Sequence, residues 1–104
     1  MSAPEHAVIV HFQYGSTDLA RLFALEEQLE HAIAVAGVGE FDGNEVAADG
    51  SDGYLYMYGP DAGRLFAAVR ATLEGTDFMR GARVKLRYGP PEDGIKEEEI
   101  DLGT

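Results

Sequence analysis

Three tyrosines and one histidine are the side chains whose type and spacing best suit chemistry or recognition. The segment DGYLYMYGP carries Tyr54, Tyr56 and Tyr58 at every second position. A strand would therefore present all three on one face. His11 lies in an apolar run near the N-terminus, and if the two segments share a surface, His11 and Tyr56 are the candidate acid and base of a small enzyme. The same tyrosines also suit a protein contact surface, because tyrosine offers a large contact area at low side-chain entropy cost.

The spacing of the polar residues indicates no metal or nucleotide site. His6 and His11 are an odd number of positions apart, so they fall on opposite faces of a strand, and His31 lies in a predicted helix. The loop DGNEVAADGSDG (42–53) is rich in oxygen ligands, but it does not match the EF-hand pattern of calcium sites. The chain has no cysteine and neither of the two glycine-rich phosphate-binding motifs. We therefore predict no catalytic residue, no cofactor and no metal.

Length and charge limit the classes of function. A chain of 104 residues fits one domain, and 45% hydrophobic residues are enough for a folded core. Eight lysines and arginines oppose 19 acidic residues, and the resulting net charge of −11 repels the phosphates of nucleic acids. No apolar run approaches the roughly 20 residues of a membrane span, and the start does not read as a signal peptide. We expect a cytoplasmic protein with a single domain (1–104) that binds neither nucleic acid nor membrane.

Hydrophobic periodicity predicts six elements in the order β-α-β-β-α-β. The predicted strands cover 6–14, 39–48, the tyrosine segment and 83–88, and the predicted helices cover 19–36 and the segment between Asp61 and Gly75. Asp61 can cap the second helix, and Gly37 can end the first in a left-handed conformation. Gly43 inside the second strand predicts a bulge or an edge position.

An internal repeat supports this order. YGSTDLARLFA (14–24) resembles YGPDAGRLFA (58–67), and each segment leads from the end of a strand into a helix. Two similar β-α-β halves are what the ferredoxin-like sandwich requires. The chain thus resembles the ferredoxin-like α+β fold over residues 6–88, and it is also similar to short acidic bacterial proteins of uncharacterised function. The resemblance implies an antiparallel sheet in the order 4-1-3-2, with both helices on one face and the other face open. Many unrelated activities use this fold, so it selects none of them.

Two patterns disagree about the direction of the tyrosines. Leu55 and Met57 are the more apolar pair, and buried tyrosine hydroxyls need partners, which favours tyrosines outward. The repeat aligns Tyr54 with Val10 of the apolar first strand, which favours them inward, although the second turn is one residue shorter. We expect the tyrosines to point outward. The open face then carries a predicted binding surface made of His11, Gln13, Tyr54, Tyr56 and Tyr58.

The C-terminal segment RYGPPEDGIKEEEIDLGT predicts a fifth strand at 95–102. The turn PPEDG connects two alternating runs, as in a hairpin. Pairing Gly89 with Ile95 sets Val84 opposite Ile100 and creates three opposite-charge pairs. These pairs are Arg83 with Asp101, Lys85 with Glu99, and Arg87 with Glu97. We expect the strand order 5-4-1-3-2, in which this tail neutralises the basic margin of the open face.

Three classes of function remain for a chain with these features. We favour a non-enzymatic binding or regulatory domain that acts through protein–protein contacts, with a homodimer formed through the sheet face. The first alternative is an immunity-type or inhibitor protein whose acidic surface neutralises a basic toxin or nuclease through Glu26, Glu27 and Glu30. The second alternative is a small dimeric enzyme of ferredoxin-like fold with a pocket on the open face.

Overall fold

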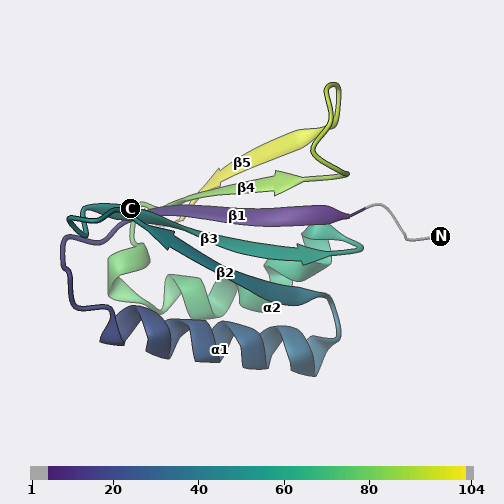
Figure 1. Cartoon of the computed structure of the whole chain (residues 1–104). Coiled ribbons are helices and arrows are strands. Elements are labelled where there is room, and N and C mark those ends of the chain that lie inside the picture. The colour runs from purple at the N-terminus through teal and green to yellow at the C-terminus, as the bar shows by residue number, and fades with distance from the viewer. Residues whose placement is uncertain (1–4, 103–104) are drawn as a thin grey trace.

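A five-stranded antiparallel sheet and two helices form the α+β fold of the computed structural model, which describes residues 5–102 (Figure 1). The elements are β1 (His6–Gln13), α1 (Ala20–Ala36), β2 (Glu40–Val46), β3 (Asp52–Gly59), α2 (Ala62–Glu74), the 3-10 helix η1 (Asp77–Met79), β4 (Arg83–Arg87) and β5 (Glu97–Asp101). Both α-helices lie on one side of the sheet (Figure 1). Within residues 5–102, no element covers the other side, which we call the open face.

The sheet has the strand order β2-β3-β1-β4-β5, and each neighbouring pair is antiparallel. Read from the β5 edge, this is the order 5-4-1-3-2 that the sequence predicts. The longest strands, β1 and β3, lie side by side in the middle, where Val10 is opposite Leu55. β2 forms one edge, and its register shifts between Phe41 and Gly43. The sequence predicts that Gly43 marks a bulge or an edge position, and the structure shows both.

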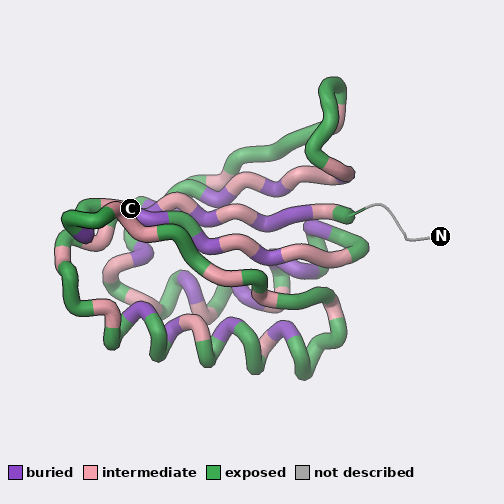
Figure 2. Tube along the Cα trace, in the orientation of Figure 1, coloured by how far each residue is buried: buried purple, intermediate pink, exposed green. Residues whose placement is uncertain are grey.

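The hydrophobic core fills the space between the sheet and the two helices (Figure 2). Leu55 and Met57 of β3 are fully buried in it, whereas Tyr54 is 38% exposed. The tyrosines therefore point to the open face, as predicted, and the inward direction suggested by the repeat is wrong. Leu55, not Tyr54, is the residue of β3 that lies opposite Val10. The shorter second turn moves the repeat by one position, which inverts the faces of a strand.

Local signals begin and end the helices much as the sequence predicts. The side chain of Asp61 accepts a hydrogen bond from the backbone N–H of Arg64 and caps α2. Gly37 ends α1 with a φ of 66°, in the left-handed region where glycine carries little steric cost. α1 begins at Ala20, one residue later than predicted, and Leu19 is its N-cap residue, whose carbonyl oxygen accepts the N–H of Phe23.

The fifth strand pairs with β4 in the predicted register, but its ion pairs are partly different. The opposed residues are Arg83 with Asp101, Val84 with Ile100, Lys85 with Glu99, and Arg87 with Glu97. The Nζ of Lys85 lies 3.9 Å from Glu97, which is its diagonal neighbour rather than the residue opposite. Arg87 instead donates from Nε to the carbonyl oxygen of Gly89 at 2.8 Å. The predicted register of β5 is therefore correct, but the predicted ionic partners of Lys85 and Arg87 are not.

Candidate functional site

The open face gathers the residues of the predicted binding surface on its two central strands. His11 lies opposite Tyr54, and Ile9 lies opposite Tyr56. Tyr58 is half-buried, and Gln13 is exposed at the end of β1. Because paired residues of neighbouring strands share a face, these side chains form one continuous surface.

An aromatic stack made of His11, Tyr54 and Tyr56 lies across this surface. The rings of His11 and Tyr54 are nearly parallel, with centroids 4.5 Å apart and planes 16° apart. Tyr54 and Tyr56 are also stacked, at 6.1 Å and 17°. Such contacts contribute about 0.5–1.5 kcal/mol beyond the area they bury. The stack is therefore already ordered, and a partner that covers it would lose little side-chain entropy on binding.

Asp52 holds His11 in this stack. The Nε2 of His11 lies 2.7 Å from the Asp52 carboxylate, and both side chains are partly exposed. The sequence pattern places Asp52 only among the oxygen-rich residues of its loop and does not indicate this contact. The signal that could have found it is the antiparallel pairing of β1 with β3, in which Gln13 lies opposite Asp52 and His11 follows two residues along the same face.

Tyr56 is fixed by an acidic residue of the edge strand. Its hydroxyl donates a hydrogen bond of 2.7 Å to Oε1 of Glu45 in β2. That bond, together with smaller contributions from burial and the Glu45 charge, raises the pKa of Tyr56 to about 12. A tyrosine that retains its proton this firmly is a poor general base at neutral pH. The geometry thus favours a positioning role for Tyr56 over the acid–base role suggested by its type.

A groove of about 350 Å³ runs along the open face towards β4. It is lined by Ile9, His11, Tyr54, Tyr56, Arg83, Val84, Lys85 and Glu99. Two cations in its wall are loosely held: Arg83 lies 3.6 Å from Asp101 and 3.8 Å from Glu99, and Lys85 lies 3.9 Å from Glu97. These distances exceed those of good hydrogen bonds, and such exposed pairs contribute at most about 1 kcal/mol. Both cations can therefore exchange their partners at low cost.

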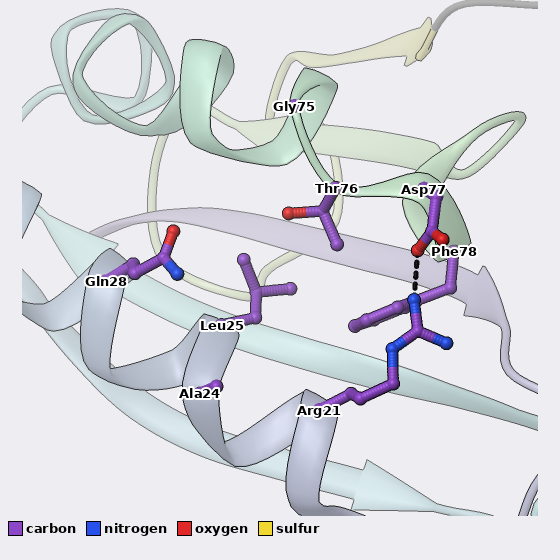
Figure 3. Close-up of a pocket in the computed structure, with 8 residues that line it drawn as sticks. All are labelled: Arg21, Ala24, Leu25, Gln28, Gly75, Thr76, Asp77 and Phe78. Carbon is purple, nitrogen blue, oxygen red and sulfur yellow. Dashed lines mark hydrogen bonds and ion pairs between the residues drawn. The ribbon is translucent and has the colours of Figure 1, made fainter.

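A second cavity, of about 430 Å³, lies between α1 and the segment that follows α2 (Figure 3). Figure 3 shows Arg21 reaching from α1 to the carboxylate of Asp77, and its guanidinium lies 5.1 Å from the centre of the Phe78 ring. The hydroxyl of Thr76 donates to the backbone oxygen of Thr72. The charge of this cavity is thus neutralised internally, and its wall offers a ligand little beyond the amide of Gln28.

The acidic residues of α1 do not form a uniform free surface. Glu26 is half-buried and accepts a hydrogen bond from the side chain of Asn44 in β2. Burial raises the pKa of Glu26, the Asn44 hydrogen bond lowers it, and the charge of Glu30 raises it further. Glu27 and Glu30 are exposed. Of the three predicted partner contacts, Glu27 and Glu30 are therefore exposed, whereas Glu26 forms a contact between α1 and β2.

Metal ligands, membrane-spanning helices and known relatives are the remaining features that bear on function. In residues 5–102, no three histidine, cysteine, aspartate or glutamate side chains lie close enough together to hold a metal ion. No helix in the part of the chain that the structure describes is long and apolar enough to cross a membrane. No family model, curated protein or solved structure matches the chain. The open face carries a groove, an aromatic stack and two loosely paired cations, and these features are the basis of the function inferred below.

Proposed function

We propose that this protein is a non-enzymatic interaction domain that forms a homodimer through the open face of its sheet. We assign its fold to the ferredoxin-like sandwich, because β1 lies between β3 and β4 and the elements follow the order β-α-β-β-α-β before β5. A cytoplasmic location fits the absence of cysteine from the chain.

The observation that carries this proposal is the uncovered aromatic stack. A sheet usually buries one face and exposes polar residues on the other, but here the exposed face carries three tyrosines and Ile9. Tyr54 is one of three large hydrophobic side chains that stay exposed in the described residues. The other two, Phe23 and Val35, are about 18 Å apart along α1 and form no common patch. Tyrosine is enriched at protein interfaces, because it offers a large contact area at low side-chain entropy cost.

A second copy of the chain is the partner that fits the charges of this face. β2 contributes an acidic column, Glu40 and Glu45, on one flank of the tyrosines. β4 contributes a basic column, Arg83, Lys85 and Arg87, on the other flank. A uniformly basic partner would face the basic column, and a uniformly acidic partner would face the acidic one. A copy of the same face presents both columns and can oppose each to its complement.

The size of the face sets the expected affinity. Five strands about 4.8 Å apart and central strands of eight residues at about 3.3 Å per residue give a face of at most about 24 by about 26 Å. Two such faces bury at most about 1,200 Å² in total even when they overlap completely, which is the lower limit for stable interfaces. We therefore expect micromolar self-association, which is visible only in concentrated samples.

A proton-transfer enzyme is the second candidate, and the His11–Asp52 contact in the groove favours it. The Asp52 carboxylate, 2.7 Å from Nε2 of His11, orients the imidazole ring as the partner of a catalytic histidine would. Tyr56 does not complete the pair, because Glu45 holds its hydroxyl and raises its pKa. The immunity-type alternative has less support, since Glu26 is engaged with Asn44.

Replacing Tyr54 by aspartate tests the proposed homodimer. Tyr54→Asp puts a charge in the centre of the interface, so we expect a folded monomer with self-association weakened at least about tenfold. Phe23→Asp is the matched control, because Phe23 is also exposed but lies on α1, on the helix side of the molecule. Sedimentation analysis at about 100 µM protein measures both, with circular dichroism to verify folding. A wild type that stays monomeric, or equal effects of the two variants, would contradict the proposal.

A further inference from the structure

We propose, on the basis of the proposed homodimer, that its two-fold axis runs parallel to the strands between β1 and β3. This arrangement places the basic column of each copy over the acidic column of the other. The position of the axis determines which strands of the two open faces meet, and in which orientation.

The strand register arranges the open face in three rows. Each row takes one residue from each strand, in the order β2, β3, β1, β4 and β5. The first row is Glu45, Tyr54, His11, Arg83 and Asp101. The second row is Gly43, Tyr56, Ile9, Lys85 and Glu99, and the third row is Glu40, Tyr58, Ala7, Arg87 and Glu97. Each row therefore runs from an acidic or empty position, through aromatic and small or apolar positions, to a cation and then a carboxylate.

A symmetric face-to-face dimer can be built in two main ways. With the axis across the strands, each strand faces its own copy, so the basic column of β4 lies over itself. Like charges that are directly opposed are unfavourable. With the axis along the strands, between β1 and β3, β1 faces β3 of the other copy and β4 faces β2. The charges of the face therefore select the second arrangement.

This arrangement predicts specific partners within each row. Arg83 faces Glu45 of the second copy in the first row, and Arg87 faces Glu40 in the third. Lys85 faces Gly43, which has no side chain and has open space above it. Sheets packed face to face lie about 10 Å apart and are rotated by about 30° relative to each other. Arginine and glutamate side chains together can span this distance and the lateral displacement that the rotation causes.

The contacts that Arg83 and Glu45 already make leave room for the new pair. Arg83 is exposed and lies 3.6 Å from Asp101 at closest, so it can turn away from β5. Glu45 is exposed, and its Oε1 accepts the Tyr56 hydroxyl. A carboxylate has four acceptor positions, so Glu45 can bind Tyr56 and an arginine together.

Exchange of charges between two variants tests this orientation. Arg83→Glu and Glu45→Arg should each weaken self-association about tenfold, because each creates two like-charge contacts per dimer. Mixed together, they should form a heterodimer at least about tenfold tighter than either homodimer, because both contacts are then of opposite charge. Lys85→Glu is the matched control: it introduces the same charge beside β5 but faces Gly43, so mixing it with Glu45→Arg should give no such gain.

Native mass spectrometry of the mixtures, with variants of distinguishable mass, measures the heterodimer directly. A preferred heterodimer of Arg83→Glu with Glu45→Arg supports the axis. Variants that weaken self-association singly but show no preference for one another overturn the axis and leave the homodimer standing. A wild type that is monomeric at about 100 µM overturns both, and it would assign the open face to a different partner.

Discussion

Tyr56 and Glu45 show how one hydrogen bond defines the chemistry of a side chain on the open face. The carboxylate of Glu45 accepts the phenolic proton and would repel a phenolate, so the pKa of Tyr56 rises from 10.0 to about 12. A folded-state pKa above the unfolded value means that the bond stabilises the fold below pH 10 and that this contribution is lost as the pH rises towards 12.

Replacing Glu45 by glutamine should therefore lower the pKa of Tyr56 towards its ordinary value. A neutral amide oxygen accepts a weaker hydrogen bond than a carboxylate and carries no charge, so both the main cause of the raised pKa and the charge contribution are reduced. A site-resolved NMR titration of the tyrosine ring carbons follows this group separately. Tyr88 is the internal control, because Glu98 raises its pKa by the same kind of hydrogen bond. An unchanged Tyr56 titration in Glu45→Gln would show that the Glu45 carboxylate does not set this pKa.

Single side chains were only partly predictable from the sequence. The direction of the tyrosines followed from the stronger apolar character of Leu55 and Met57, which are fully buried. The partner of Arg87 did not follow, because a long guanidinium side chain at a strand end reaches several acceptors and here binds the carbonyl of Gly89. The contact of His11 with Asp52 joins residues 41 positions apart. Only the register between β1 and β3, which are far apart in the sequence but adjacent in the sheet, brings them together.

At the level of elements, the residue that follows β5 belongs to the hydrophobic core. Leu102 is 1% exposed, and its backbone N–H donates to the carbonyl oxygen of Ala82 at 2.8 Å. Its side chain belongs to the same buried cluster as Val84 and Leu86 of β4. The C-terminal segment therefore closes the core at the β4 edge.

Truncating Leu102 should destabilise the whole fold. Leu102→Ala removes a fully buried side chain, so we expect a loss of about 2–5 kcal/mol in the free energy of unfolding. Urea denaturation measures this loss. Glu99→Ala in the adjacent β5 is the control: its side chain is exposed, and a change within about 0.5 kcal/mol is expected. A Leu102→Ala variant as stable as the control would mean that the segment after β4 contributes little to the core.

The sequence predicts most elements but misses η1. Helical periodicity and capping groups predicted the two helices, alternation and turn residues predicted the strands and the register of β5, and the resemblance to the ferredoxin-like fold implied the order of the first four strands. η1 spans three residues, too few for any hydrophobic period to be visible. It nevertheless buries Met79 and brings the ring of Phe78 to 5.1 Å from that of Tyr14. Such short elements are fixed by the core that they complete rather than by their own sequence pattern.

The charge of the whole molecule sets the conditions in which the dimer can form. Each copy has a net charge of −11. Two copies whose centres are about 25 Å apart therefore repel each other by about 20 kcal/mol in water without salt. With a Debye length of about 8 Å at physiological salt, the repulsion falls to roughly 1 kcal/mol. Self-association should therefore be measured at about 0.15 M salt, where the contacts of the open face can outweigh the repulsion.

Isotope-filtered NMR on a mixture of labelled and unlabelled protein tests the homodimer most directly, because it detects only proton contacts between two copies. At about 100 µM or above, we predict contacts between the Ile9 methyl groups of one copy and the Tyr56 ring of the other. These residues occupy the central row of the open face. Contacts between copies that involve only α1, or none at all at this concentration, would contradict the account.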